Sequence, residues 1–103
     1  MRSGRLNGQE VDVCELMVPD PEKWWYPREM ARASHNKLGQ TSIYVVLTRM
    51  AAFGLLETQE GKQRLYRLSE YGTKIYEAQM IEERAAAQLR RQAMRLKPKG
   101  AMG

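Results

Sequence analysis

An amphipathic helix followed at once by two short strands is the feature that most constrains this fold. Over residues 41–53, apolar side chains recur at intervals of three and four, which predicts one buried stripe on a helix. The stripe consists of Ile43, Val46, Leu47, Met50 and Phe53. We expect Thr41 or Ser42 to cap this helix and Gly54 to end it in the left-handed conformation.

A β-hairpin is predicted directly after this helix. Residues 55–58 and 64–68 have the composition of strands, and Glu60-Gly61-Lys62 between them has that of a turn. Because side chains alternate along a strand, Tyr66 and Leu68 share one face of the second strand.

Proline divides the chain before this unit. Residues 1–8 form a polar lead, which we expect to be flexible and to contribute nothing to a core. Residues 9–18 show the spacing of a short amphipathic helix, which Pro19 and Pro21 end. Pro27 suits the first turn of a second short helix, because its missing N–H is not needed there.

The remaining boundaries follow from turn and cap residues. The second helix is expected to stop near 34–36, with Gly39 closing the turn. Ser69 is a suitable start for a final helix, and because no proline interrupts it this helix can span 69–97. Residues 98–103 are expected to form a disordered tail.

Few side chains in this sequence are suited to catalysis. One cysteine, Cys14, and one histidine, His35, leave no Cys/His cluster for zinc and no Cys–His or Ser–His–Asp signature. We therefore expect no enzyme activity, no metal site and no cofactor, and interpret Cys14 as a small core residue. The 103 residues suffice for one domain with one modest core.

The sequence also bears on location. It contains no run of about 18 apolar residues, the length that a membrane-spanning helix needs. Met1 to Gly8 is polar with no apolar stretch behind it, so no secretory signal is expected. A lone Cys14 forms no internal disulfide, which fits a reducing compartment. We expect a cytoplasmic, nucleoid-associated protein.

Charge is distributed unevenly along the chain. Residues 1–22 hold two basic and five acidic side chains, for a net charge of −3, whereas residues 23–103 hold 15 basic and 7 acidic ones, for +8. No Asp or Glu lies between Met30 and Phe53, and residues 84–103 hold six basic side chains and no acidic one. This basic excess suits a polyanionic partner.

The predicted fold class is mainly α with a small β-hairpin. The order of the elements is that of a winged helix-turn-helix domain, over residues 9–68, followed by a long C-terminal helix over 69–97. In this plan a helix enters the major groove of double-stranded DNA, and the hairpin tip reaches flanking phosphates. We predict DNA contacts from the turn, the helix and the hairpin tip. They come from His35, Asn36, Lys37, Gln40, Thr41, Ser42, Tyr44, Val45, Thr48, Arg49, Lys62, Gln63 and Arg64.

Three stretches, Ser42 to Met50, Gly54-Leu-Leu56 and Tyr66-Arg-Leu-Ser-Glu-Tyr-Gly72, together resemble PadR-like winged helix-turn-helix transcriptional regulators. That family has a Tyr in the recognition helix, a Leu–Arg–Leu run, a Gly–Leu step into the wing and Tyr-x-Leu-Thr-x-x-Gly leaving it. The matching positions are Tyr44, Leu47, Arg49, Met50, Gly54, Leu55, Tyr66, Leu68, Ser69 and Gly72. The resemblance implies DNA binding, commonly repression, by a dimer built partly by the last helix. The short acidic first helix and Ser69, where Thr is usual, depart from the pattern.

The last helix carries apolar residues at roughly heptad spacing, which predicts a short seam for a homodimer. The predicted dimer residues are Trp24, Trp25, Ile75, Ala78, Ile81, Ala85 and Leu89. We interpret the two tryptophans as core residues or dimer anchors rather than as a stacking platform.

Other interpretations remain open at several of these positions. Tyr44 can pack against the turn, Arg49 can pair with an acid, and the hairpin-tip charges can be merely solvated. A winged helix can also serve as a protein-interaction adaptor without DNA binding, and the Arg-rich end can bind RNA or single strands.

Overall fold

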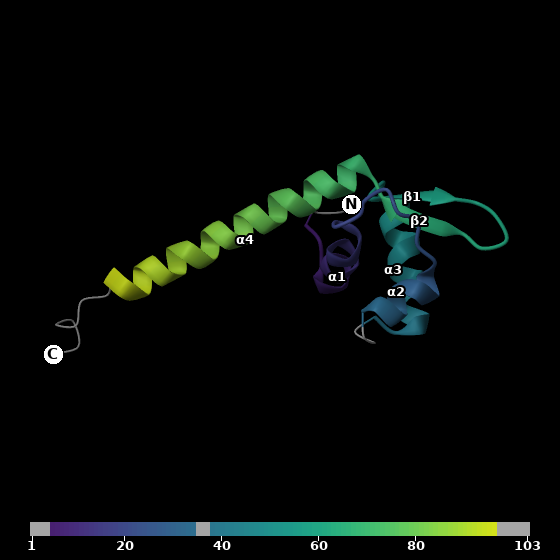
Figure 1. The fold of residues 1–103 in the computed structure, drawn as a ribbon. Helices are drawn as coiled ribbons and strands as arrows, with labels where there is room; N and C mark the ends of the chain where they lie inside the picture. Colours follow the sequence, from purple (N-terminus) through teal and green to yellow (C-terminus); the bar gives the residue numbers. More distant parts are fainter. Residues whose placement is uncertain (1–4, 35–37, 97–103) are drawn as a thin grey trace.

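The computed structural model describes residues 5–34 and 38–96 (Figure 1). It has the predicted fold class, mainly α with one small antiparallel hairpin. The elements are α1 (Gly8–Met17), α2 (Pro27–Ala33), α3 (Gln40–Ala52), β1 (Leu56–Gln59), β2 (Leu65–Leu68) and α4 (Glu70–Leu96). The helices α1, α2 and α3, the hairpin and the start of α4 enclose one core, and the rest of α4 extends away from it (Figure 1).

The segment before α1 belongs to this core. Leu6 is only 4% exposed, so the prediction that residues 1–8 contribute nothing to a core is wrong at this position. The physical reason is a capping box on α1, in which Asn7 Oδ1 accepts from Glu10 N and Glu10 Oε1 accepts from Asn7 N, both at 2.9 Å. The backbone of Leu6 in turn bonds the side-chain amide of Gln79 on α4, which holds Leu6 against the core.

The turn between α2 and α3 is held by Ser34. Its hydroxyl donates to the carbonyl of Ala31 at 2.8 Å and accepts from the N–H of Leu38 at 3.1 Å. Pro27 is the first residue of α2, as predicted, and Met30 and Ala31 are buried. The Ser34 hydroxyl thus connects the end of α2 to Leu38, just before α3.

The helix α3 buries Ile43, Val46, Leu47 and Met50, which confirms most of the predicted stripe. Phe53 is 45% exposed, so its assignment to the stripe is wrong: it is the C-cap, where the helical repeat has already ended.

The two ends of α3 differ in type of cap. The prediction of Thr41 or Ser42 as the N-cap is wrong: the N-cap is Gly39, because the helix begins at Gln40. At the other end Gly54 has φ +78°, as predicted for a left-handed stop. Gly54 N donates to Ala51 O at 3.0 Å and Leu55 N to Met50 O at 2.9 Å, the paired bonds of a Schellman motif.

The hairpin runs antiparallel with Leu56 opposite Leu68 and Gln59 opposite Leu65. Tyr66 and Leu68 face the core, as the alternation predicts. Trp25 pairs with the outer edge of β2, since Trp25 N donates to Tyr66 O at 2.7 Å and Tyr66 N donates to Trp25 O at 2.9 Å. Its side chain is 8% exposed, so of the two interpretations, core or dimer anchor, Trp25 fits the core.

The helix α4 begins at a hydroxyl cap, as predicted. Ser69 Oγ accepts from Gly72 N at 2.9 Å and donates to Gly54 O at 2.7 Å, which ties α4 to the end of α3. With 27 residues the helix is about 40 Å long, so its second half lies beyond the domain (Figure 1). Within the described ranges, no helix is both long and apolar enough to cross a membrane.

Candidate functional site

The outward face of α3 is a polar surface on the side opposite its buried stripe. Ser42, Tyr44, Val45, Thr48 and Arg49 are all exposed, with Tyr44 at 52% and Val45 at 54%. Tyr44, Val45, Thr48 and Arg49 line one shallow depression together with Ala52. Four of the five predicted residues of α3 whose side chains are described therefore share one surface depression.

Arg49 carries a positive charge on this face with no carboxylate beside it. Among residues 5–34 and 38–96, the ion pairs join other partners and none includes Arg49. Within this part of the chain, therefore, no carboxylate neutralises Arg49, as the alternative interpretation would require. An exposed guanidinium of this kind offers a planar fork of N–H donors to an acceptor outside the chain.

Five of the predicted contacts come from the turn and the first two residues of α3. His35, Asn36 and Lys37 fall outside the described residues. Gln40 and Thr41 form the first turn of α3, but their side chains are likewise outside the described part.

The tip of the hairpin supplies a second group of cations. Lys62, Gln63 and Arg64 are exposed between β1 and β2. Arg64 Nε lies 2.7 Å from Glu60 Oε1. A side-chain hydrogen bond with Tyr66, followed by the interaction with Glu60, raises the pKa of Arg64 above its usual value. Lys62 has no ion-pair partner among the described residues.

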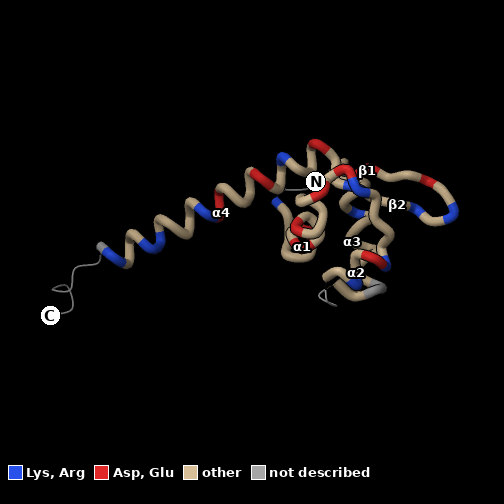
Figure 2. Tube along the Cα trace, in the orientation of Figure 1, with Lys and Arg blue, Asp and Glu red and all other residues tan. Residues whose placement is uncertain are grey.

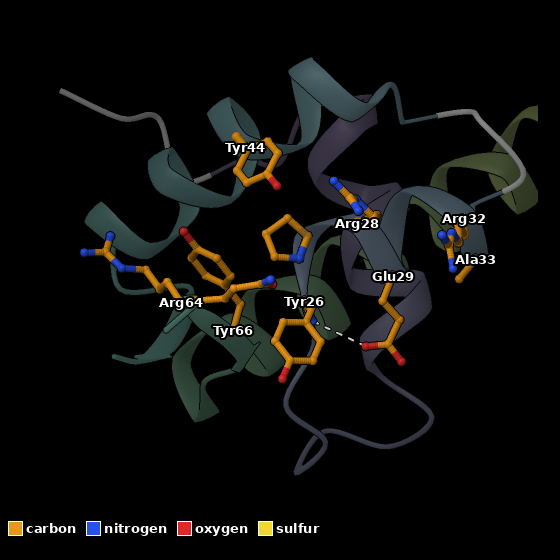
Figure 3. Close-up of a pocket in the computed structure, with 10 residues that line it drawn as sticks. Tyr26, Arg28, Glu29, Arg32, Ala33, Tyr44, Arg64 and Tyr66 are labelled. Atoms are coloured by element: carbon orange, nitrogen blue, oxygen red, sulfur yellow. Dashed lines mark hydrogen bonds between the residues drawn. The ribbon is translucent and has the colours of Figure 1, made fainter. Parts of the chain in front are cut away.

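A groove of about 830 Å³ connects α2, α3 and the hairpin, and the sequence did not predict it (Figure 3). Its lining includes Tyr44, Gln63 and Arg64 from the predicted set. The residues that the sequence analysis missed are Tyr26, Pro27, Arg28, Glu29, Arg32, Ala33 and Tyr66. The sequence held one signal for this groove, the spacing of Arg28 and Arg32. They are four residues apart on α2, so they share its exposed face, whereas Met30 and Ala31 lie on the buried face.

The dimer candidates on α4 divide into two groups. Ile75 is partly buried against the domain's own core, whereas Ala78, Ile81, Ala85 and Leu89 are exposed, with Ile81 at 66% and Leu89 at 65%. Figure 2 shows α4 changing from mixed charge near the domain to Lys and Arg alone toward its far end.

Trp24, another dimer candidate, lies beside Arg67 of β2. It is half-buried, with the guanidinium of Arg67 4.4 Å from the centre of its ring. This contact within the chain covers one side of the indole.

The arrangement of α2, turn, α3 and a two-stranded wing defines a winged helix-turn-helix protein. No protein-family model matches the sequence, and no curated protein does either. The structure, however, superposes on a PadR family transcription regulator from Clostridium difficile R20291 with a TM-score of 0.62, covering 82% of this chain and 97% of that one at 21% identity. The fold is thus that of the PadR-like winged helices.

Two further solved structures share the fold. The PcaV transcriptional regulator from Streptomyces coelicolor, solved with its natural ligand, has a TM-score of 0.59 at 18% identity, over 91% of this chain and 78% of its own. The archaeal chromatin protein TrmBL2, whose structure shows a novel mode of DNA binding, has a TM-score of 0.54 at 22% identity, over 87% of this chain but 34% of its own.

Proposed function

We propose that this protein binds double-stranded DNA and regulates transcription, with α3 in the major groove and the hairpin wing on the flanking backbone. The main support for this proposal is the exposed face of α3, which has no acidic residue and lies beside a cationic wing tip. A helix fits the major groove, where hydroxyl and guanidinium groups reach base edges. The shared fold of two transcription regulators and a chromatin protein supports this proposal.

The proposal gives the exposed residues different tasks. Thr48 and Arg49, on the outward face of α3, read base edges, while Lys62 and Arg64 contact phosphates. Arg28 and Arg32 of α2 join the phosphate contacts, because both are exposed and neither has an ion-pair partner among the described residues. The remaining predicted contacts stay in the proposal: His35, Asn36, Lys37, Gln40, Thr41, Ser42, Tyr44, Val45 and Gln63.

A salt series on duplex DNA tests this function. The affinity of the full chain for a randomised duplex should fall steeply and linearly on logarithmic axes as salt rises, because each phosphate contact releases condensed counterions. Fluorescence anisotropy of a labelled duplex measures it. If no duplex binds even at low salt, while the chain forms a stable complex with another protein, the adaptor function is the correct one.

Base-reading and phosphate contacts should respond differently to substitution. We expect Arg49→Ala to cost about 1–3 kcal/mol on a preferred site and to relax the preference at one position. Lys62→Ala should instead weaken all duplexes alike and reduce the salt slope by about 1. Binding of both variants to a preferred and a scrambled duplex measures the contrast. Equal losses on both duplexes for Arg49→Ala would contradict a base-reading role.

Homodimerisation through α4 is the second part of the proposal. Ala78, Ile81, Ala85 and Leu89 follow one another at spacings of three and four, so they form an apolar stripe on a helix that leaves the domain (Figure 1). A second copy of the chain would cover this stripe. Two recognition helices related by two-fold symmetry could then occupy one operator and exclude other proteins, which is the repressor function that we propose.

A charge placed on the stripe should break the dimer. We expect Leu89→Glu to raise the dimer dissociation constant at least tenfold, because a carboxylate in an apolar seam is not solvated. Met94→Glu is the matched control, since Met94 is 78% exposed and five residues further on, roughly 140° around the helix. Sedimentation equilibrium measures both variants. Equal effects of the two substitutions would place the interface elsewhere.

A further inference from the structure

The far half of α4 carries three arginines along one side of the helix. Arg84, Arg91 and Arg95 are separated by seven and four residues, so they follow one another on the same face. All three are exposed, and among residues 5–34 and 38–96 none takes part in an ion pair. No acidic residue follows Glu83 in the sequence. These three residues, the arginine row, therefore present a net positive charge to the outside.

The arginine row is clear of both the domain and the proposed dimer seam. In the described part of the chain, the last side chains of α4 that pair with the domain are Glu82 and Glu83, which contact Arg5. Leu89, at the end of the seam, is five residues beyond Arg84 and so lies about 140° around the helix from it. The row therefore stays exposed when a second copy covers the seam.

The arginine row also lies far from the wing. Figure 1 shows the hairpin and the far end of α4 at opposite ends of a molecule whose longest dimension is 68 Å. In Figure 2 the hairpin tip carries basic side chains, and the far end of α4 carries no acidic one. The protein thus has two separate cationic surfaces, one at each end of its long axis.

The composition of this segment favours duplex phosphates over other polyanions. Arginine offers phosphate a planar fork of N–H donors. The row extends over about 16 Å of helix axis, along which one strand of B-DNA presents about five phosphates. No aromatic residue follows Tyr76, whereas single strands bind by stacking on aromatic side chains and membrane-surface helices insert large apolar ones such as Trp and Phe.

We infer that the arginine row binds the phosphate backbone of a second DNA duplex, so that the protein bridges two DNA segments. The contact does not depend on base sequence, because pairs between guanidinium and phosphate position a duplex without reading it. The affinity of the row for a duplex is independent of α3. Bridging, however, rests on the proposed function, in which α3 and the wing hold the first duplex.

Capture of a free duplex by a bead-bound duplex tests the bridging. The full chain, loaded on beads that carry a random-sequence duplex, should retain a fluorescent second duplex, and less of it as salt rises. The triple variant Arg84→Gln, Arg91→Gln, Arg95→Gln should still load on the beads through α3 and the wing. It should retain about tenfold less of the second duplex, with a salt slope reduced by about 3, one for each lost phosphate contact.

Arg90→Gln is the matched control for the row. Arg90 is exposed and adjacent to Arg91, but it lies about 100° around the helix, where it lines a depression together with Glu82 and Glu83. We expect Arg90→Gln to retain the second duplex as the parent does, and Arg91→Gln to reduce the salt slope by about 1. Sedimentation equilibrium should show that the triple variant is still a dimer.

The outcomes separate this inference from the proposed function. If the parent binds one duplex but retains no second one, or if the triple variant retains it equally, the inference is overturned and the function of α3 stands. If the triple variant loses all duplex binding while Arg49→Ala, Lys62→Ala keeps it, duplex binding by the row stands and the function of α3 fails. Row-dependent binding of single-stranded DNA or phosphatidylserine vesicles, in place of the second duplex, also overturns the inference.

Discussion

Replacing Gly72 by alanine should destabilise this domain by about 3 kcal/mol, one of the two largest effects we expect from a single substitution. A Cβ at this position would lie 2.1 Å from the carbonyl oxygen of Leu55 and 3.1 Å from Leu68 Cδ1. The first of these atoms is backbone and belongs to the step from α3 into the wing, so it cannot simply rotate away. Urea unfolding followed by tryptophan fluorescence measures the change.

Gly8→Ala is the matched control for this prediction. Gly8 is the first residue of α1, and nothing lies within 4 Å of a Cβ added there. We expect a change of about 0–1 kcal/mol in the stabilising direction, since alanine restricts the unfolded chain more than glycine. A Gly72→Ala variant as stable as Gly8→Ala would show that α4 does not approach the wing as closely as described.

Gln79→Leu should cost about 2–4 kcal/mol, because it leaves two buried backbone groups unpaired. Gln79 is 5% exposed; its Oε1 accepts from Leu6 N at 2.7 Å and its Nε2 donates to Leu6 O at 3.0 Å. One amide thus completes the hydrogen bonding of the segment before α1 and attaches it to α4. The free energy of unfolding in urea is the measurement.

Gln88→Leu controls for the general effect of removing an amide from α4. Gln88 is exposed nine residues further along the same helix, and we expect its substitution to change stability by less than about 0.5 kcal/mol. Gln79→Glu should cost at least as much as Gln79→Leu, because it places a carboxylate at a buried position against Leu6 O and Glu83 Oε1. Equal stabilities of the two leucine variants would contradict the role given to Gln79.

The elements that the sequence predicted are those governed by a local repeat. The spacing of Ile43, Val46, Leu47 and Met50 fixed α3, and the alternation in β2 placed Tyr66 and Leu68 inward, because burial against one core follows helical or strand periodicity. The exception, Phe53, lies where the repeat stops.

Features that depend on distant segments were not predictable from spacing. The pairing of Leu6 with Gln79 joins positions 73 residues apart, and in sequence Gln79 is one polar residue in a largely polar helix. The groove was missed for the same reason: Arg28, Tyr44 and Arg64 belong to three elements, and only the packing of α2 against α3 and the wing brings them together. The sequence therefore located the exposed face of α3 but not the groove beside it.

Selection of bound sites from a pool of random duplexes tests the central claim most directly, because every possible operator sequence competes in the same pool. If the outward face of α3 reads the major groove in a two-fold symmetric dimer, the selected duplexes should share an inverted repeat. Its half-sites should lie about 10 base pairs apart or a multiple of that. Selection with the Arg49→Ala variant should give duplexes that have lost the base preference at one position. A pool that gains no common sequence after repeated rounds would contradict sequence-specific DNA binding by this protein.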